Sequence, residues 1–253
     1  MPRLTPALMR ALDILELFLD PERRLDAADV SRCTGLPRTT AHELVTTLIT
    51  RGYLQREEGS LLRLGPKLLA LGDAYSARYD LLGEATAVAK DLCAETGETA
   101  SVALLEGAEV FYIAKAEPHD SLPTLSRIGQ RLPAHCTALG KVLLADLAPE
   151  EVARRYPAGG RLPTLTPRSL STLEALLAEL DVVRARGVAY EIEESGPNTH
   201  CVAAAVQNSL GRAVAAVSLA VPISRWELRQ QHEWDELIRG AAARLSAQYG
   251  YAA

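Results

Sequence analysis

The amino-acid sequence predicts an α+β protein in two parts, a winged helix-turn-helix over residues 1–65 and a larger domain with an antiparallel sheet over residues 81–253, joined by a linker helix over residues 66–80. Three observations support this interpretation. A helix, a glycine turn, a second helix and a hairpin follow one another between residues 25 and 64. The net charge changes near residue 80, from +1 before it (11 basic, 10 acidic) to −6 after it (16 basic, 22 acidic). Paired apolar runs alternate with amphipathic helices in the second part.

The first element is an amphipathic helix that ends at Asp20-Pro21-Glu22. Its leucines recur at three- and four-residue spacing, which places them on one stripe of a helix. We expect this stripe to pack beneath the helix-turn-helix rather than to contact DNA. The stripe consists of Leu4, Leu8, Leu12, Leu15 and Leu19.

The helix-turn-helix follows directly. Its first helix carries Val30 and ends at Gly35, which supplies the turn. Pro37 suits the first turn of the second helix, because proline has no amide hydrogen to satisfy there. The side chains expected to pack inward on that helix are Ala41, Leu44, Val45 and Leu48. Those expected to face DNA, as on a helix laid in the major groove, are Arg38, Thr39, Thr40, His42, Glu43 and Thr46.

A hairpin over residues 53–64 completes this part and turns at residues 57–60. It places Arg51, Arg56 and Arg63 along the side of the wing that would contact phosphates. Residues 30–67 contain six Arg or Lys against three Glu, although the whole chain has a net charge of −5. The alternative, a small helical subdomain with a solvated charged face, does not explain why glycine, proline, threonines and wing fall in this order.

The composition limits the classes of function. With 48% apolar and 23% charged residues, the 253-residue chain can form a proper core. Its aromatic content of 5% argues against a stacking surface for single-stranded nucleic acid, and its pI of about 5.6 argues against general polyanion binding. The four cysteines are widely separated and form no CxxC motif, and we find neither a membrane-length apolar run nor a signal peptide. We therefore expect a cytoplasmic protein without a membrane partner.

The linker helix begins after Gly65-Pro66 and carries a short apolar seam made of Leu68, Leu71, Tyr75 and Tyr79. Such a seam either packs against its own chain or pairs with a second copy. We expect a dimer, because one reading head of this size would bind duplex DNA weakly.

The second part predicts an antiparallel sheet covered by helices. In chain order we expect a helix over 82–96, strands over 99–105 and 109–115, an extended segment over 122–128 and a helix over 136–147. Two capping boxes, at 171–174 and 224–227, then open helices on either side of strands over 188–192, 200–207 and 212–221.

Motifs for catalysis are absent: the sequence contains no GxSxG, P-loop, GxGxxG or HExxH, and we expect neither enzymatic activity nor a cofactor. The pairs His135-Cys136 and His200-Cys201 permit an alternative, a metal- or thiol-dependent sensor or enzyme. Adjacent residues of a strand face opposite ways, so each pair would offer only one side chain to a shared site. Buried or pocket-lining side chains without a metal are therefore the expectation.

A metabolite pocket is the stronger expectation for this part. The turn into the helix at residues 135–141 would present free backbone amides to a small carboxylate. We expect it to contribute His135, Cys136, Ala138 and Leu139, opposite Glu191, Cys201 and Ser218, with an apolar wall of Leu122, Leu125 and Ile128. The ordinary alternative is that these side chains are core or cap residues, and that Glu191 is a solvated strand residue.

Three segments in order resemble an IclR-family transcriptional regulator: GLPRTTAHELVTTLITRGYL, LPAHCTALGKVLLA and GVAYEIEESGPNTHCVAAAVQNSLGRAVAAVSLAVPISR. The resemblance implies a dimer or dimer of dimers that binds double-stranded operator DNA. It also implies a GAF-like C-terminal domain that binds a small organic acid or aromatic metabolite. The family pattern places effector contacts at Ala138, Leu139, Glu191, Cys201 and Ser218.

The sequence departs from that pattern at three positions. Leu139 replaces a small residue at the helix start, Glu191 replaces an aspartate, and Ala220 replaces a serine. We expect these changes to reshape the pocket, so that a more apolar or aromatic ligand is as compatible with it as a pyruvate- or glyoxylate-like acid. The mechanism we hypothesise is that the ligand changes the spacing or pairing of two reading heads.

Overall fold

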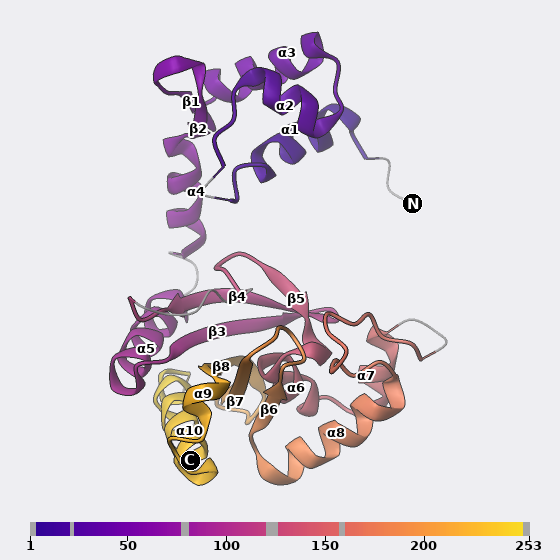
Figure 1. Cartoon of the computed structure of the whole chain (residues 1–253), viewed down its shortest axis with the longest axis vertical. Coiled ribbons are helices and arrows are strands. Elements are labelled where there is room, and N and C mark those ends of the chain that lie inside the picture. Colours follow the sequence, from indigo (N-terminus) through magenta and orange to yellow (C-terminus); the bar gives the residue numbers. More distant parts are fainter. Residues whose placement is uncertain (1–3, 21–22, 77–80, 120–125, 157–159, 250–253) are drawn as a thin grey trace. The chain divides into compact units, whose positions relative to one another are not determined.

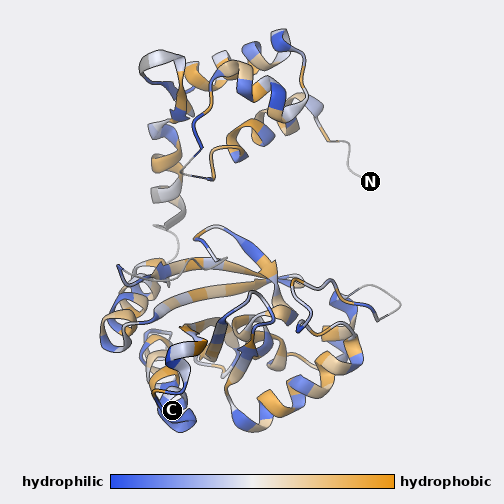
Figure 2. Ribbon diagram, viewed as in Figure 1, coloured by the Kyte–Doolittle hydropathy of each residue, from blue (hydrophilic) through white to orange (hydrophobic). Residues whose placement is uncertain are grey.

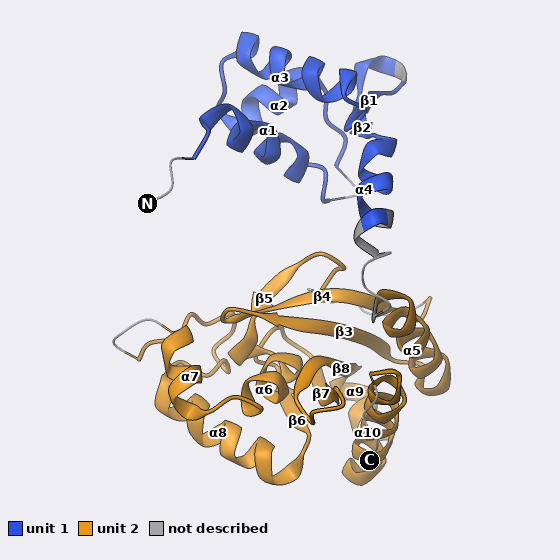
Figure 3. Cartoon of the chain, turned by 180° about the vertical axis from the view of Figure 1, so that it is seen from behind, with its two compact units in different colours: residues 1–79 blue, residues 80–253 orange. Residues whose placement is uncertain are grey.

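The computed structural model describes residues 4–20, 23–76, 81–119, 126–156 and 160–249. The chain divides into two compact units, residues 1–79 and residues 80–253 (Figure 3). The first is helical with a small hairpin, and the second is built on a six-stranded sheet (Figure 1). This confirms the predicted combination of a helix-turn-helix domain with an α+β domain.

The N-terminal unit has the predicted order of elements. It comprises α1 (Pro6–Glu16), α2 (Ala27–Thr34), α3 (Arg38–Thr50), β1 (Leu54–Arg56), a 3-10 turn (Glu58–Ser60), β2 (Leu62–Leu64) and α4 (Pro66–Ser76). A capping box between Asp26 and Asp29 begins α2, and Gly35 ends it with a φ of +68°. The turn between α2 and α3 therefore rests on the residue type that its backbone requires.

The predicted packing face of α1 is wrong. Ile14 is fully buried and Phe18 is 8% exposed, and both pack into the core of this unit with Val30 and Val45. The leucines of the predicted stripe lie largely outside this core, with Leu8 59% exposed. Apolar residues occupy more than one face of this helix, so leucine spacing alone does not identify the buried one. Of the predicted stripe, Leu4, Leu12 and Leu19 are also exposed, and only Leu15 is half-buried.

The linker seam can be followed only in part. In α4, Leu68 is half-buried and Leu71 is 47% exposed. The side chain of Tyr75 and the whole of Tyr79 lie outside the described residues. Pairing of this helix with a second copy stays a prediction.

The sheet of the C-terminal unit is antiparallel, with strand order β5-β4-β3-β8-β7-β6. Its strands are β3 (Thr99–Glu106), β4 (Glu109–Ala116), β5 (Arg131–Pro133), β6 (Ala189–Ile192), β7 (Thr199–Gln207) and β8 (Ala213–Pro222). Its helices are α5 (Leu81–Thr96), α6 (Ala138–Ala145), α7 (Pro149–Arg155), α8 (Leu173–Arg186), α9 (Ile223–Trp226) and α10 (Gln231–Gln248). The predicted strands over 99–105, 109–115, 188–192, 200–207 and 212–221 are confirmed, whereas some of the predicted helix starts are not. Of the extended segment predicted over 122–128, residues 122–125 lie outside the described residues and Ile128 lies in a turn, and β5 was not predicted.

Helices cover both faces of the sheet, and each face has its own core. On one face α5 and α10 bury Leu92, Trp234 and Ile238 against the strands. On the other face α6 and α8 bury Leu144 and Leu180. Figure 2 shows apolar residues concentrated where these helices meet the sheet. Because both faces are covered, the strands are apolar on both sides over much of their length.

Several predicted helix starts are shifted or wrong. The N-cap of α8 is Thr172, whose hydroxyl accepts from the amide of Ala175, one residue later than the predicted box. The box at residues 224–227 does not open the last helix, because α10 begins at Gln231 behind Gln230. Residues 223–226 instead form α9, where Arg225 makes a bidentate ion pair with buried Glu98 at 2.7 Å. That ion pair is a tertiary contact, and the local sequence contains no sign of it.

Among the helices that the structure describes, none combines the length and the hydropathy needed to cross a membrane.

Gly140 allows α6 to pass against the preceding turn. A Cβ at this position would lie 2.1 Å from the carbonyl oxygen of Ala134, which no rotamer change relieves. We expect Gly140→Ala to lower the free energy of unfolding by about 1 to 3 kcal/mol, as overpacking does. Gly240 in α10 has open space around its Cα, so Gly240→Ala should raise the free energy of unfolding by about 1 kcal/mol. Urea unfolding of the full chain measures both, and equal effects would show that the close approach to Ala134 is not what requires glycine.

Candidate functional site

Two surfaces of the chain gather polar side chains. The first is the outer face of α3. Ala41, Val45 and Leu48 are buried on the inner face. The residues predicted to face DNA lie on the other side, where Arg38, Thr39, His42, Glu43 and Thr46 are exposed and Thr40 is half-buried. The structure therefore brings the whole predicted set to one helix face.

The first turn of α3 is suited to a phosphate. Pro37 occupies the N-cap position, no side chain caps the helix start, and no acidic residue lies in the first turn. Unsatisfied amides and the helix dipole attract anions at such an end. Arg38 is exposed at the first helical position.

The wing is less positive than its arginines suggest. Arg51, Arg56 and Arg63 are all exposed, as predicted. Glu57 lies 3.6 Å from the guanidinium of Arg63 and 3.9 Å from that of Arg24, measured between charged atoms. The carboxylate of Glu57 therefore offsets part of the positive charge of the wing. The count of charged residues included Glu57 but could not show that it lies beside Arg63 and Arg24.

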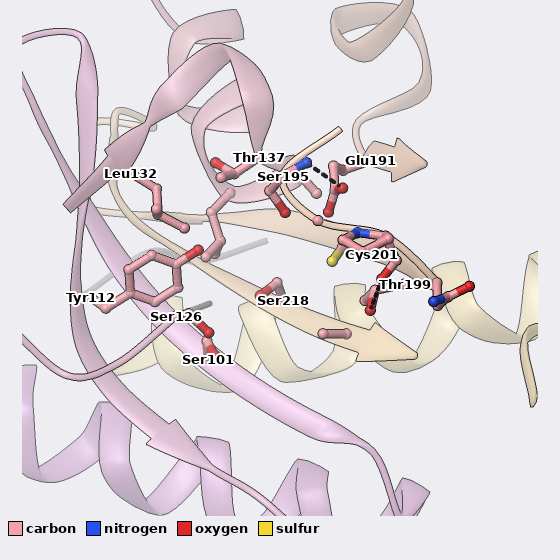
Figure 4. Close-up of a pocket in the computed structure, with 16 residues that line it drawn as sticks. Ser101, Tyr112, Ser126, Leu132, Thr137, Glu191, Ser195, Thr199, Cys201 and Ser218 are labelled. Carbon is pink, nitrogen blue, oxygen red and sulfur yellow. Dashed lines mark hydrogen bonds between the residues drawn. The ribbon is translucent and has the colours of Figure 1, made fainter. Parts of the chain in front are cut away.

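The second surface is the wall of a cavity of about 370 Å³ in the C-terminal unit (Figure 4). The first turn of α6 forms one side through Thr137, Ala138 and Leu139. The sheet forms the floor, and the segment between β6 and β7 forms the side that includes Ser195. In Figure 4, Tyr112 of β4 and Glu191 of β6 lie at opposite sides, with Ser218 between them. The cavity is large enough for a small metabolite.

Strand register builds the floor. Glu191 pairs with Cys201 across β6 and β7, and Cys201 pairs with Ala220 across β7 and β8. Ser218 lies two residues before Ala220 on β8 and pairs with Ser101 of β3. Because side chains alternate between faces, both rows point to the side of the sheet that carries α6. Each of these five residues lines the cavity.

Several residues that the sequence assigned to the pocket lie elsewhere. His135 is buried, but its Nε2 lies 2.8 Å from the carbonyl oxygen of Pro163 and its ring packs edge-on against Tyr156. The thiol of Cys136 points to the same carbonyl. Both residues belong to a 3-10 turn that directs them away from the cavity. Ile128 lies in a turn and is 64% exposed, and Leu122 and Leu125 lie outside the described residues.

Sequence reasoning also missed part of the lining. Ser101 and Tyr112 belong to β3 and β4, where alternation along each strand would have put them on the correct face. Leu132 takes the place in the wall that the sequence assigned to Ile128. Ser195 and Asn198 come from the irregular segment before β7, for which no periodic signal exists.

Glu191 is the most unusual residue of the cavity. It is 1% exposed, so the solvated-strand alternative is wrong. Its Oε1 accepts hydrogen bonds from the amides of Glu194 (2.7 Å) and Ser195 (2.9 Å), whereas its Oε2 makes no hydrogen bond of normal geometry. Burial raises the pKa of its carboxyl, which the Cys201 thiol and the amides only partly oppose. Glu191 thus contributes to the lining a buried carboxyl group whose Oε1 is already hydrogen-bonded and whose Oε2 is fully buried.

The remaining chemistry of the cavity favours binding over catalysis. No Lys, Arg or His lines it within the part of the chain that the structure describes. An anion would rely on the start of α6, but the amide of Gly140 is already capped by the hydroxyl of Thr137 at 2.9 Å, so only the other amides of the first turn could serve it. Burial and the neighbouring Glu191 raise the pKa of the Cys201 thiol well above its usual value, and a protonated thiol is a poor nucleophile.

The two His-Cys pairs do not converge on a metal-like arrangement. His200 packs edge-on against Trp226, with ring centroids 5.3 Å apart, while its neighbour Cys201 lines the cavity. Across the described ranges, no group of three or more His, Cys, Asp or Glu side chains is placed to hold a metal ion. The structure thus separates the residues on which the metal alternative depended.

The chain matches two family models, the IclR helix-turn-helix domain over residues 7–58 and the bacterial transcriptional regulator IclR C-terminal domain over residues 73–247. It is similar to the HTH-type transcriptional regulator XynR of Escherichia coli strain K12, with 37% identity over 96% of this chain and 97% of the relative.

Two solved structures are similar over nearly the whole length. The IclR of Thermotoga maritima has 25% identity and a TM-score of 0.82, covering 96% of this chain and 98% of that one. An IclR homologue of Microbacterium hydrocarbonoxydans in complex with 4-hydroxybenzoate has 26% identity and a TM-score of 0.83, covering 96% and 99%.

The raised pKa of Glu191 predicts a pH-dependent loss of stability. Below about pH 4.3, the usual value for glutamate, native and unfolded chains are both protonated and the shift has no effect. As the pH rises, the unfolded chain releases its proton first, so the native state loses stability until the pH passes the raised pKa. The free energy of unfolding of Glu191→Gln minus that of wild type should therefore increase as the pH rises above about 4.5, and level off once the pH passes the raised pKa of Glu191. The increase is about 1.4 kcal/mol for each pH unit by which the pKa is raised.

Chemical unfolding of the full chain at several pH values measures this difference. Glu236→Gln removes an exposed carboxylate from α10 and serves as the matched control. A difference that is flat with pH for Glu191→Gln would show that the buried carboxyl is not proton-linked to folding.

Proposed function

The chain belongs to the IclR family of transcriptional regulators, and we propose that it is a sequence-specific DNA-binding regulator whose operator affinity changes when a small molecule occupies the cavity of the C-terminal unit. The observation that carries the proposal is the cavity itself, which is lined by Glu191 and several hydroxyl groups, in a chain whose α3 also exposes polar and basic side chains. The Cys201 thiol of the lining has a raised pKa and is a poor nucleophile, so we propose binding without turnover.

The DNA partner is inferred from α3 and the wing. Exposed hydroxyls and a guanidinium at the start of α3 are groups that contact phosphates and base edges in the major groove. Because the chain as a whole has a net charge of −5, this attraction is local. Two copies acting on a two-fold operator would supply the affinity that one head lacks, so we infer a homo-oligomer.

The ligand is inferred to be a small organic acid or an aromatic acid. Amides at the start of α6 suit a carboxylate, and Tyr112, Leu132 and Leu139 supply apolar surface around the body of such a molecule. The complex of the Microbacterium hydrocarbonoxydans homologue makes 4-hydroxybenzoate a reasonable first probe for this chain. The ligand need only prefer one arrangement of the heads by about 1 to 3 kcal/mol to change operator occupancy.

Substitution of Arg38 tests the reading helix. With purified protein and duplex DNA from upstream of its own gene, we expect Arg38→Ala to weaken binding about tenfold and to reduce the slope of log K against log salt by about one. Arg244→Ala removes an exposed positive charge from α10 and should leave both quantities unchanged. Scrambled duplex gives the non-specific baseline. Equal binding of wild type to both duplexes, with or without added acids, would contradict sequence-specific recognition.

Filling the cavity tests the ligand site. A panel of monocarboxylic acids that includes 4-hydroxybenzoate should raise the melting temperature of wild type, since a ligand at about 100 times its Kd stabilises by about 2.7 kcal/mol. Ala220→Ile fills the floor and should abolish the shift, leaving operator binding without ligand intact. Ala213→Ile, on the same strand outside the lining, is the control. A shift that survives Ala220→Ile would place the ligand elsewhere, and a chemically altered ligand would argue for an enzyme.

A further inference from the structure

Lys141 is buried although it takes no part in lining the cavity. It lies on α6, one turn after Ala138 and Leu139, and is 2% exposed. Its Nζ lies 2.6 Å from Oε1 of Glu194 and 3.0 Å from the carbonyl oxygen of Tyr190. Hydrogen-bonded, paired charges of this kind are sensitive to substitution, because removing one partner leaves the other buried without compensation.

The partner of Lys141 belongs to the opposite wall. Glu194 lies in the segment of residues 193–198, between β6 and β7, which contributes Ser195–Asn198 to the cavity lining. The ion pair therefore connects the helix that forms one side of the cavity with the segment that forms the other.

The segment needs such support. Glu193 and Asn198 have φ values of +56° and +60°, a region that side-chain-bearing residues seldom adopt and that persists only where surrounding contacts impose it. The contacts that impose it here are polar. Glu191 accepts from two amides of the segment, and the hydroxyl of Ser169 donates to the carbonyl of Glu194 at 2.7 Å. The hydroxyl of Thr166 donates to the carbonyl of Glu193 at 2.7 Å.

Among these contacts the ion pair is the one that reaches α6. Ser169 and Thr166 fix the segment to the chain before α8, and Glu191 fixes it to β6. Lys141 also lies 3.7 Å from Glu179 of α8, a carboxylate that is partly exposed and less closely placed. The distance between the two walls thus depends on Lys141 and Glu194.

We propose that Lys141 is a positioning residue, which holds the segment of residues 193–198 against α6 through its ion pair with Glu194 and thereby sets the width of the ligand cavity. The inference rests on the proposed function for its consequence, ligand affinity, but not for its structural content. Lys141 itself does not touch the ligand.

Hydrogen exchange of the full-length protein tests the structural content without a ligand. The variants are Lys141→Met, which keeps the length of the stem, and Glu194→Gln, which keeps the shape of the acid. We expect peptides covering residues 193–199 to exchange about tenfold faster or more in either variant, while peptides from α5 and α10 keep the wild-type rate. The double variant should be no worse than the more affected single variant, because both changes break one pair.

Glu179→Gln is the matched control, and in this variant peptides covering residues 193–199 should exchange as in wild type. If Lys141→Met does not fold, Glu194→Gln carries the comparison alone. Exchange that rises uniformly over the C-terminal unit, effects that add in the double variant, or an unchanged segment would each overturn the proposal.

A calorimetric titration with 4-hydroxybenzoate tests the consequence. We expect Glu194→Gln to weaken its binding about tenfold, whereas Glu179→Gln leaves it unchanged. If wild type does not bind this acid, the titration uses the acid of the panel that raises the melting temperature most, and the exchange data decide whether Lys141 holds the segment. Wild-type affinity in a variant whose segment exchanges faster would overturn the link between segment and cavity.

Discussion

The cavity exists because small side chains meet in register where β7 and β8 face α6. Cys201 pairs with Ala220, and Ala203 pairs with Ser218, so two neighbouring rows on one face of the sheet carry no bulky group. A sheet covered by a helix normally closes such a space with large residues. In this domain the lining includes the large residues Tyr112, Leu132 and Leu139, with Tyr112 at one side of the cavity (Figure 4), and the space above the small residues remains open.

The burial of two acidic side chains beside the open cavity has an electrostatic consequence. Glu191 and Glu194 are both removed from water, burial raises the pKa of each, and Lys141 opposes the shift only at Glu194. Two backbone amides donate to Oε1 of Glu191, whereas its Oε2 is buried without a hydrogen bond of normal geometry. A buried polar group that lacks a partner destabilises the native state. The burial of Glu191 beside the cavity therefore lowers the stability of the domain.

The sequence predicted the elements of the site better than its boundaries. Period-two alternation along β6, β7 and β8 was sufficient to bring Glu191, Cys201 and Ser218 together, because register transmits a local pattern across a sheet. The predictions that Ile128 belongs to the apolar wall and that His135 lines the cavity were wrong, because both residues lie in irregular segments. Such segments have no periodic pattern from which the direction of a side chain could be predicted. The pairing of Lys141 with Glu194, 53 residues away, could not be predicted from the sequence for a further reason. Long-range polar contacts depend on tertiary placement, which neither propensity nor spacing encodes.

The two surfaces differ in how tightly they are tied to the fold. Arg38 and His42 are exposed on α3, and exposed positions of this kind usually change stability by no more than about 0.5 kcal/mol when substituted. Glu191 and Lys141 are nearly inaccessible and hold neighbouring segments in place, so a change there alters stability and cavity shape together. Substitutions on the outer face of α3 should thus leave the fold intact. A substitution of Glu191 also changes the support of residues 193–198, whereas the small residues of the floor, such as Ala220, are positions where the shape of the cavity can be changed separately.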